Sequence, residues 1–589
     1  MAAPPSRLQL VRMIRTLRTL LYKRGEDPAT LVGTTLRSWC VNAYPKLRLP
    51  RLPWSSKLAA APEMIAFLRL LERLPFFDAA YWLSTSYAAL SDETYRKTFA
   101  LYFTPPPIAN RLVADLVRSG VKFGNDKFID PACGGAAFLA ILASRMRKAL
   151  KRQGLSSKRI LQHAESHLSG IDIDPVLCAL SRCLMQMVFY DEISIASRHP
   201  HFNIVCADSL RTFRKFSGRF DVVVCNPPFR KLTYMEAKQL RPMFGEVMQA
   251  QPNLYSLFIN LSARLARPRG LVGLVTPTSF LSGQYFSGVR TFLLKSTDPL
   301  HFGIVTKRSR VYFDVQQETA LTVFRARHRS KPTATRTAVS VVNAAGKYRT
   351  VGRCRLPNSG ASWPVARDAA DFELIEAAST SPFRLEDYGY TPCIGAYVWT
   401  RDERPVFLTS RDVPKKHRPT AVPLIWSSDI RPNGQLSFES DHPADGQHRF
   451  VTLGSLAHPS VWQSPGVMLQ RVTSNDQPRR LVGAVITPQF VREYGGFVGE
   501  NHTVLLAQMA DRSVLTARSL LQLLRAPAID RYFRCISGST TVSAFELLQL
   551  PLPDPVQLRR QLSAGVPMQQ AAEALLLKRH LKRSKPRVA

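Results

Sequence analysis

The chain has 589 residues, 45% of them hydrophobic, so it is too long for one ordinary core and long enough for two folded domains with flanking pieces. It carries 80 Lys and Arg against 43 Asp and Glu, a formal net charge of +37, which indicates a polyanionic partner such as nucleic acid. Solubility alone does not account for this excess, because added acidic residues serve solubility better than basic ones.

The cysteines and the hydropathy pattern exclude other classes of protein. The nine cysteines are scattered and lack the paired short spacings of a zinc site or a secreted disulfide framework. No apolar run approaches the roughly 18 residues that a membrane helix needs. We therefore expect reduced thiols, no metal site and a cytoplasmic protein.

Residues 1–95 have the pattern of helical segments, and we assign no chemistry to them. The first 25 residues are rich in arginine and lack acidic residues, as an organelle transit peptide does. Their apolar residues nevertheless recur at helical spacing, which favours a basic amphipathic helix that belongs to the protein.

Residues 96–328 alternate between short β-branched runs and helical patterns. The runs are KFID, LSGIDID, FNIVCAD, FDVVVCNPPF, LVGLVTP, FGIVTK and VQQETALTVF. This alternation predicts βαβ units on a mostly parallel, Rossmann-like α/β sheet, and we expect the last two runs to form an antiparallel edge.

The remainder of the chain divides into three parts. Residues 329–384 are turn-rich and basic, and we interpret them as a linker or a poorly structured excursion. Residues 385–555 have a mixed character that predicts a second folded domain, and residues 556–589 are expected to be a basic tail.

Acidic residues end three successive strands of the predicted sheet. Asp130 precedes a turn of small residues, PACGGAA, where the backbone can approach a ligand before a helix begins. Asp172 ends the next strand, where it can accept hydrogen bonds from both hydroxyls of a ribose, and Asp208 follows the third. The separation from Asp130 to Asp172 exceeds that of a compact dinucleotide fingerprint, so we expect an extended helix or an insertion there.

The strand FDVVVC stops at Asn226-Pro227-Pro228-Phe229. Proline lacks a backbone donor and fixes φ, so this turn is stiff and presents carbonyl oxygens. The Asn226 side-chain oxygen and the Pro227 carbonyl can accept the two hydrogens of an exocyclic amine, while Phe229 stacks on the base that carries it. On these residues alone, an ordinary Asn-Pro turn with a packed Phe stays open.

In this order and spacing, DPACGGAAF, GIDIDP, Ala207-Asp208 and NPPF resemble the amino-methyltransferases that use S-adenosylmethionine. The preceding YFTPP resembles the segment before the fold in gamma-class N6-adenine DNA methyltransferases of type II restriction-modification systems. Further on, MLQRVT, RRL and GENH look like the target-recognition half of type II modification methylases. SGST with LLQLPLP is similar to the end of recognition domains shared with type I specificity subunits.

The resemblance implies a Rossmann-like methyltransferase domain with S-adenosylmethionine as cofactor and a separate mixed α/β target-recognition domain. The implied cofactor residues are Thr104 for the methionine carboxylate, Asp130 and Ala132 for the methionine and sulfonium region, Gly134 in the turn, Asp172 for the ribose, Ile173 against the adenine ring and Asp208 for its amino group.

The resemblance also implies where the target base binds. Asn226, Pro227, Pro228 and Phe229 would take an adenine rotated out of duplex DNA, and Phe313 is expected as a second stacking aromatic. The reaction would be direct methyl transfer to N6 of adenine at a specific site, without a covalent nucleophile.

The implied partners are double-stranded DNA and a cognate restriction endonuclease on a separate chain, with this chain a monomer in the bacterial or archaeal cytosol. Two alternatives stay open. One is an RNA or protein amide methyltransferase, because NPPY-type turns also serve those substrates. The other is a DNA-binding protein with an inactive methyltransferase half. The second is motivated by Gly134-Gly135-Ala136, which stands where the family usually has Gly-Ser-Gly and adds a methyl group.

Overall fold

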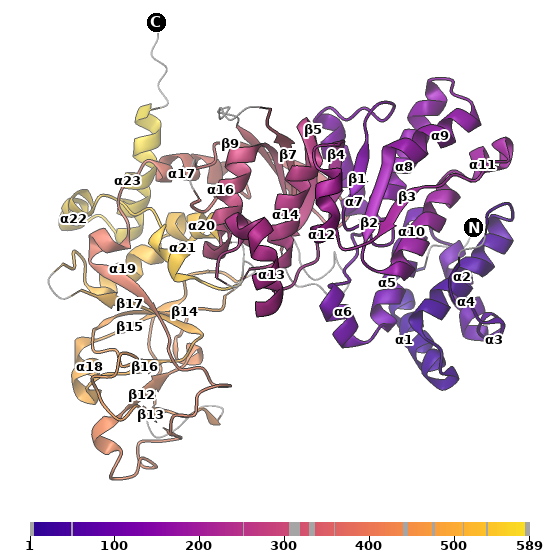
Figure 1. The fold of residues 1–589 in the computed structure, drawn as a ribbon. Helices are drawn as coiled ribbons and strands as arrows, with labels where there is room; N and C mark the ends of the chain where they lie inside the picture. Colours follow the sequence, from indigo (N-terminus) through magenta and orange to yellow (C-terminus); the bar gives the residue numbers. More distant parts are fainter. Residues whose placement is uncertain are drawn as a thin grey trace, which may run out of the picture. The chain divides into compact units, whose positions relative to one another are not determined.

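The computed structural model describes residues 5–48, 51–250, 252–305, 318–328, 336–357, 360–439, 446–473, 477–509, 512–537 and 540–583. The chain divides into two compact units (Figure 1). The first consists of Met1–Phe280 and Tyr285–Gly360, and the second of Leu281–Gln284 and Ala361–Ala589. Within the described ranges, no helix combines the length and apolar character of a membrane span.

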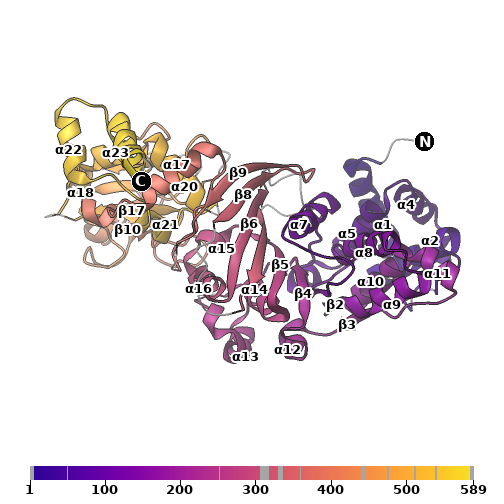
Figure 2. The ribbon, with the colours of Figure 1, turned by 90° about the horizontal axis from the view of Figure 1, so that it is seen from above.

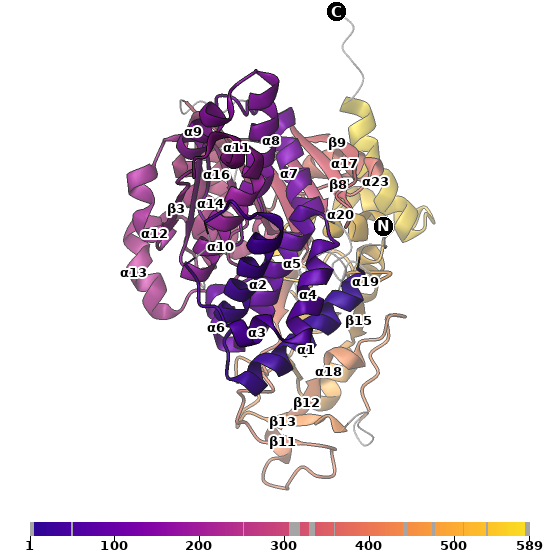
Figure 3. The same cartoon turned by 90° about the vertical axis from the view of Figure 1, so that its right-hand side faces the viewer.

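The first unit begins with helices that precede the sheet in the chain. The apolar face of α1 is buried, as the helical spacing of its residues predicts, and the helix ends at Gly25 with a left-handed φ of 63°. Figure 3 shows α1, α2, α4 and α5 side by side, and their apolar residues share one core with the helices of the sheet. The helices are α1 (Arg7–Arg24), α2 (Pro28–Ala43), α3 (Ser56–Ala59), α4 (Pro62–Glu72), α5 (Phe76–Leu90) and α6 (Glu93–Phe99).

The described strands of the first unit form one sheet in the order β3-β2-β1-β4-β5-β7-β6-β8-β9. The strands from β3 to β5 run parallel, and β7 is antiparallel to both of its neighbours, β5 and β6. The predicted Rossmann-like sheet is therefore confirmed. The strands are β1 (Phe128–Asp130), β2 (Leu168–Asp172), β3 (Asn203–Cys206), β4 (Phe220–Cys225), β5 (Ala266–Pro277), β6 (Thr297–Val305), β7 (Thr319–Ala326), β8 (Thr337–Val342) and β9 (Tyr348–Cys354).

Helices cover both faces of this sheet (Figure 2). α7 packs against β5 and β7, whereas α14 packs against β4 and β5 from the other side. Between Asp130 and Asp172, where an extended helix or an insertion is expected, the structure has two helices, α8 and α9. The helices are α7 (Pro106–Arg118), α8 (Leu139–Arg152), α9 (Ser157–His167), α10 (Pro175–Val188), α11 (Tyr190–Ala196), α12 (Ser209–Thr212), α13 (Tyr234–Phe244), α14 (Leu254–Leu265), α15 (Ser279–Ser282) and α16 (Ser287–Ser296).

Two expectations for the end of this unit are wrong. β6 and β7 do pair antiparallel, but β8 pairs with β6 and β9 pairs with β8, so the sheet continues past the expected edge. The stretch 329–384 is correspondingly not a linker, since it contains both added strands and α17. Val339 and Val342 of β8 are fully buried, yet the strand is short and flanked by turn residues that hid its pattern.

The second unit is a mixed α/β unit with two four-stranded sheets among its described residues, β10-β17-β14-β15 and β11-β13-β12-β16. The strands are β10 (Tyr390–Ile394), β11 (Val406–Phe407), β12 (Ala421–Ile425), β13 (Phe450–Thr452), β14 (Gly466–Gln470), β15 (Gly483–Ile486), β16 (Val498–Gly499) and β17 (Thr503–Gln508). The helices are α17 (Ala369–Ser379), α18 (Pro488–Tyr494), α19 (Ala517–Leu524), α20 (Pro527–Ile536), α21 (Ala544–Leu548), α22 (Pro555–Ser563) and α23 (Met568–Arg583).

The expectation of a basic tail at residues 556–589 is wrong for the described part. α22 and α23 lie there, and α23 packs against α17, α19 and α20. Leu558, Ala571 and Ala572 are fully buried. Apolar residues at helical spacing are interspersed with basic ones here. The basic residues therefore led to the prediction of a tail, although the apolar residues form a packing face.

Candidate active site

The carboxyl ends of the first four strands in the chain line one cavity of about 310 Å³. Residues 98–104, which comprise the end of α6 and the segment after it, form one wall, and residues of α13 and α14 form another. The predicted site residues among the lining are Thr104, Asp130, Ala132, Gly134, Asp172, Ile173, Asp208, Asn226 and Pro228. Pro227 and Phe229 are not among the lining residues, and Phe313 lies outside the described residues.

The small-residue turn after β1 is shaped by close contacts with other segments. Gly134 has a φ of 49°, and a Cβ atom there would lie 3.0 Å from the Phe103 ring. At Gly135 a Cβ atom would lie 1.9 Å from the Ser84 hydroxyl of α5, so a side chain does not fit. Ala136 has a φ of 60°, a conformation that costs an alanine about 1–2 kcal/mol.

The extra methyl group of Ala136 does not enter the cavity. Ala136 is fully buried, and it lines a separate small void with residues of α5 and not the 310 Å³ cavity. The departure from the usual Gly-Ser-Gly thus changes the packing between the turn and α5. It places no atom where a ligand of the cavity would lie.

Asp130 is a buried carboxyl group and Asp172 a partly buried one, and both are held by backbone N–H groups. Asp130 accepts from the Ala132 N–H at 3.0 Å, and burial raises its pKa to about 8. Asp172 accepts from the Gly134 N–H at 2.8 Å and the Asp174 N–H at 3.0 Å, and burial raises its pKa to about 6. Both groups gain from a ligand that donates hydrogen bonds or carries positive charge, since either stabilises the ionised form.

The other cofactor candidates lie around these two acids. Asp208 caps α12 by accepting from the Leu210 N–H at 2.9 Å and forms an ion pair with Arg211 at 3.3 Å. Ile173 is half exposed on the cavity lining. The Thr104 hydroxyl is buried without a hydrogen-bond partner, which makes it available to a ligand.

Asn226 is oriented by the wall that follows α6. Its Nδ2 group donates to the Tyr102 carbonyl at 3.0 Å. A carbonyl only accepts, so this bond fixes which way the amide points. The Asn226 side-chain oxygen is buried and has no hydrogen-bond partner. The structure therefore holds an oriented and unsatisfied acceptor at the end of β4.

Phe229 packs within a row of aromatic side chains. Its ring meets Tyr255 edge-on with centroids 6.0 Å apart, and Tyr255 stacks on Phe286 at 5.1 Å. The Tyr255 hydroxyl lies 2.8 Å from the Ser279 hydroxyl. These contacts hold the Phe229 ring beside the turn that carries Asn226.

Comparison with known proteins identifies the domain around this cavity. Residues 166–307, which include the Asn226 turn, match the Eco57I restriction-modification methylase family. The chain carries a restriction-modification methylase domain. The predicted resemblance to these methylases is thereby confirmed, and the cofactor is S-adenosylmethionine.

Two curated type II methyltransferases are similar over most of this chain. M.BsuBI of Bacillus subtilis is 24% identical over 469 residues, which cover 77% of this chain and 87% of the relative. M.PstI of Providencia stuartii is 21% identical over 483 residues, which cover 79% and 89%. The fold is also similar to that of the type IIL restriction-modification enzyme MmeI, which was solved in complex with DNA. The TM-score is 0.55 and the sequence identity 13%, and the match covers 97% of this chain and 89% of MmeI.

Sequence reasoning missed several polar residues in and beside this cavity. Arg230, directly after the NPPF turn, pairs with Glu236 of α13 through two contacts of 2.9 and 2.6 Å, and both residues line the cavity. Arg230 lowers the pKa of Glu236 to about 2. The TxxE capping box at the start of α13 was a local signal for Glu236. Asp174 was also missed, although an Asp before Pro is a common helix cap.

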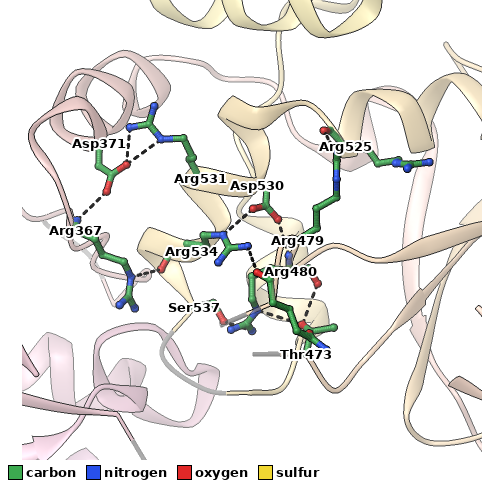
Figure 4. Close-up of polar contacts among 11 residues, drawn as sticks. Arg367, Asp371, Thr473, Arg479, Arg480, Arg525, Asp530, Arg531, Arg534 and Ser537 are labelled. Atoms are coloured by element: carbon green, nitrogen blue, oxygen red, sulfur yellow. Dashed lines mark hydrogen bonds and ion pairs between the residues drawn. The ribbon is translucent and has the colours of Figure 1, made fainter. Parts of the chain in front are cut away.

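The motifs of the methylase's second unit meet in a polar network (Figure 4). The fully buried side chain of Arg480 donates to the hydroxyls of Thr473 at 3.2 Å and Ser537 at 2.8 Å. Its backbone N–H donates to Asp530 at 2.7 Å, and Asp530 pairs with Arg534 at 2.7 Å. Segments that are far apart in the sequence are thereby joined into one framework.

Proposed function

We propose that this methyltransferase transfers the methyl group of S-adenosylmethionine to the N6 amino group of an adenine in duplex DNA. The observation that carries the proposal is the Asn226 side-chain oxygen, an oriented acceptor without a partner beside a cavity ringed by acids. An exocyclic amine supplies the hydrogen that this oxygen lacks.

The cavity suits the cofactor in size and chemistry. Its volume lies within the range of about 300–1,000 Å³ typical of small-molecule sites. Asp172 would accept from the ribose hydroxyls, Asp208 from the adenine amino group and the free Thr104 hydroxyl would meet the methionine carboxylate. Asp130, Ala132 and Gly134 would lie along the methionine, and Ile173 against the adenine ring. When bound, S-adenosylmethionine supplies an electrophilic methyl group on a sulfonium.

The target amine would be held by the NPPF turn. The Asn226 oxygen and the Pro227 carbonyl accept one amino hydrogen each, which leaves the nitrogen lone pair free and aligned. Phe229 stacks on the base and offsets part of the few kcal/mol that unpairing and unstacking cost. Pro228 keeps the turn stiff, so these acceptors need not reorganise during transfer.

Duplex DNA fits the charge of the chain. The net charge of +37 favours a polyanion, and the second unit carries the motifs that resemble target-recognition domains. We propose that this unit reads base edges while lysines and arginines contact phosphates. The enzyme would act in the cytosol as a monomer, with a cognate endonuclease on a separate chain.

Side-by-side assays of tritium transfer to unmodified duplex DNA, RNA and protein test the proposal. We expect label in DNA as N6-methyladenine, in one short sequence motif found by modification-sensitive sequencing. Transfer to RNA or to protein amides in place of DNA would contradict it. Transfer to cytosine would leave the DNA partner but contradict the base.

A further inference from the structure

Two tyrosines of the amino-terminal helices contact the residue that caps α10. Tyr87 of α5 and Tyr95 of α6 donate their hydroxyl hydrogens to the same oxygen of Asp174, Oδ2, at 2.9 and 3.0 Å. The other oxygen accepts the backbone N–H groups of Val176 and Leu177. Asp174 is 1% exposed, so water does not supply these hydrogen bonds. Its carboxylate position is therefore set from two sides, by α10 and by the tyrosines.

Asp174 in turn helps to orient Asp172. The Asp174 N–H donates to Oδ1 of Asp172 at 3.0 Å, and the Gly134 N–H donates to Oδ2 at 2.8 Å. Each oxygen of Asp172 thus accepts one backbone hydrogen bond, and the direction of its remaining lone pairs depends on where these two amides lie. A displacement of Asp174 would turn the acceptors proposed for the ribose.

The two hydroxyls are suited to hold a carboxylate permanently. Burial and the negative charge of Asp174 raise the pKa of Tyr87. Burial also raises the pKa of Tyr95. Both groups therefore stay protonated and donate throughout the physiological pH range. Hydrogen bonds to a charged acceptor are roughly twice as strong as neutral ones, so losing both is a substantial perturbation.

Tyr95 also anchors a wall of the cavity. Its helix, α6, ends within residues 98–104, which line the cavity. Within this wall the Tyr102 carbonyl accepts the hydrogen bond that orients Asn226. The amino-terminal helices thus contact Asp174 directly, and α6 leads into the segment that orients Asn226.

We infer that Tyr87 and Tyr95 are positioning residues for the methyl donor, holding Asp174 so that Asp172 presents its free lone pairs to the ribose hydroxyls. This inference rests on the proposed role of Asp172 and extends it to a region to which the sequence assigned no chemistry. The tyrosines need not touch the cofactor, because they act through Asp174.

The test uses the full chain with Tyr87→Phe, Tyr95→Phe and the double substitution. Calorimetry measures the Kd of S-adenosylhomocysteine and of its 2′,3′-dideoxy analogue, which lacks the ribose hydroxyls. We expect affinity for the intact ligand to fall about 3-fold in each single variant and about 10-fold in the double variant. For the dideoxy analogue we expect the loss to disappear. In turnover assays, KM for S-adenosylmethionine should rise while KM for DNA stays unchanged.

Tyr390→Phe is the matched control. The Tyr390 hydroxyl is buried and donates to the Leu515 carbonyl at 2.7 Å within the second unit, so its loss should lower the thermal midpoint and leave ligand affinity unchanged. Double-variant affinities equal to wild type would overturn the inference, and so would an equal loss for both ligands, which indicates general loosening. If the wild-type chain itself does not distinguish the two ligands, the role of Asp172 fails first.

Discussion

Replacing Asn226 by alanine removes the acceptor proposed for the target amine while leaving the cofactor residues in place. The substitution deletes the unpartnered oxygen and the hydrogen bond to the Tyr102 carbonyl. The Pro227 carbonyl still accepts one amino hydrogen, so one of two contacts to the nitrogen is lost. Loss of one preorganised polar contact to a reacting group typically lowers kcat about 10²- to 10³-fold, or about 3–4 kcal/mol. We expect a loss of that size.

The assay is single-turnover transfer of tritiated methyl groups to unmodified genomic DNA, with calorimetric Kd values for S-adenosylhomocysteine alongside. Ligand affinity should stay at the wild-type value, because Asp172 and Asp208 do not depend on the Asn226 side chain. Asn260→Ala is the matched control. Asn260 of α14 is also a buried amide that donates once, to Glu246 at 3.0 Å, and whose oxygen lacks a partner, but it does not line the cavity. A transfer rate for Asn226→Ala close to that of Asn260→Ala would refute the role given to the side chain.

Three further predictions concern charge, stability and the cofactor turn. Burial raises the pKa of Asp172 to about 6, so the group loses its charge as the pH falls, and affinity for S-adenosylhomocysteine should decrease between about pH 7.5 and about pH 5.5. Titration calorimetry measures this, and Asp172→Asn should flatten the profile. A pH-independent wild-type affinity would contradict the assignment. Arg480→Met should lower the unfolding free energy of the second unit by about 3 kcal/mol, because it removes the hydrogen bonds that the buried guanidinium donates to the Thr473 and Ser537 hydroxyls, whereas the exposed Arg492→Ala should have little effect. Equal thermal midpoints for these two variants would show that the network does not stabilise the unit. Ala136→Gly should raise the thermal midpoint slightly, by relieving a left-handed alanine, and leave ligand affinity unchanged. Tighter binding by this variant would mean that the methyl group hinders the cofactor after all.

Sequence reasoning located those parts of the site that short, contiguous sequence motifs mark. Asp130 and Asp172 end buried strands and Asn226 directly follows one, and parallel strands bring their carboxyl ends to one edge of the sheet. The alternation of runs and helical patterns therefore sufficed to predict the Rossmann-like sheet and the cluster of acids. β8 was not predicted, because a six-residue strand within a turn-rich stretch is too short to show a clear periodicity.

The parts that sequence reasoning missed are contacts between distant segments. Tyr87 and Asp174 are 87 residues apart, and no local pattern marks a tyrosine hydroxyl that donates to a helix cap. The Tyr102 carbonyl orients Asn226, which lies 124 residues further on. Because this carbonyl is a backbone group, the residue type at position 102 does not indicate the contact. The Phe313 assignment stays a prediction, since that residue lies outside the described part of the chain.

These contacts change how the amino-terminal helices are understood. A region without chemical motifs would ordinarily be taken as a separable appendage, yet its apolar residues share one core with the sheet helices. Ser84 lies where any side chain at Gly135 would clash, so α5 fixes the shape of the turn proposed for the cofactor. Deleting residues 1–95 would expose that core and remove both donors to Asp174. The catalytic body of this methylase therefore consists of the helices together with the sheet, because both donors to Oδ2 of Asp174 come from the helices.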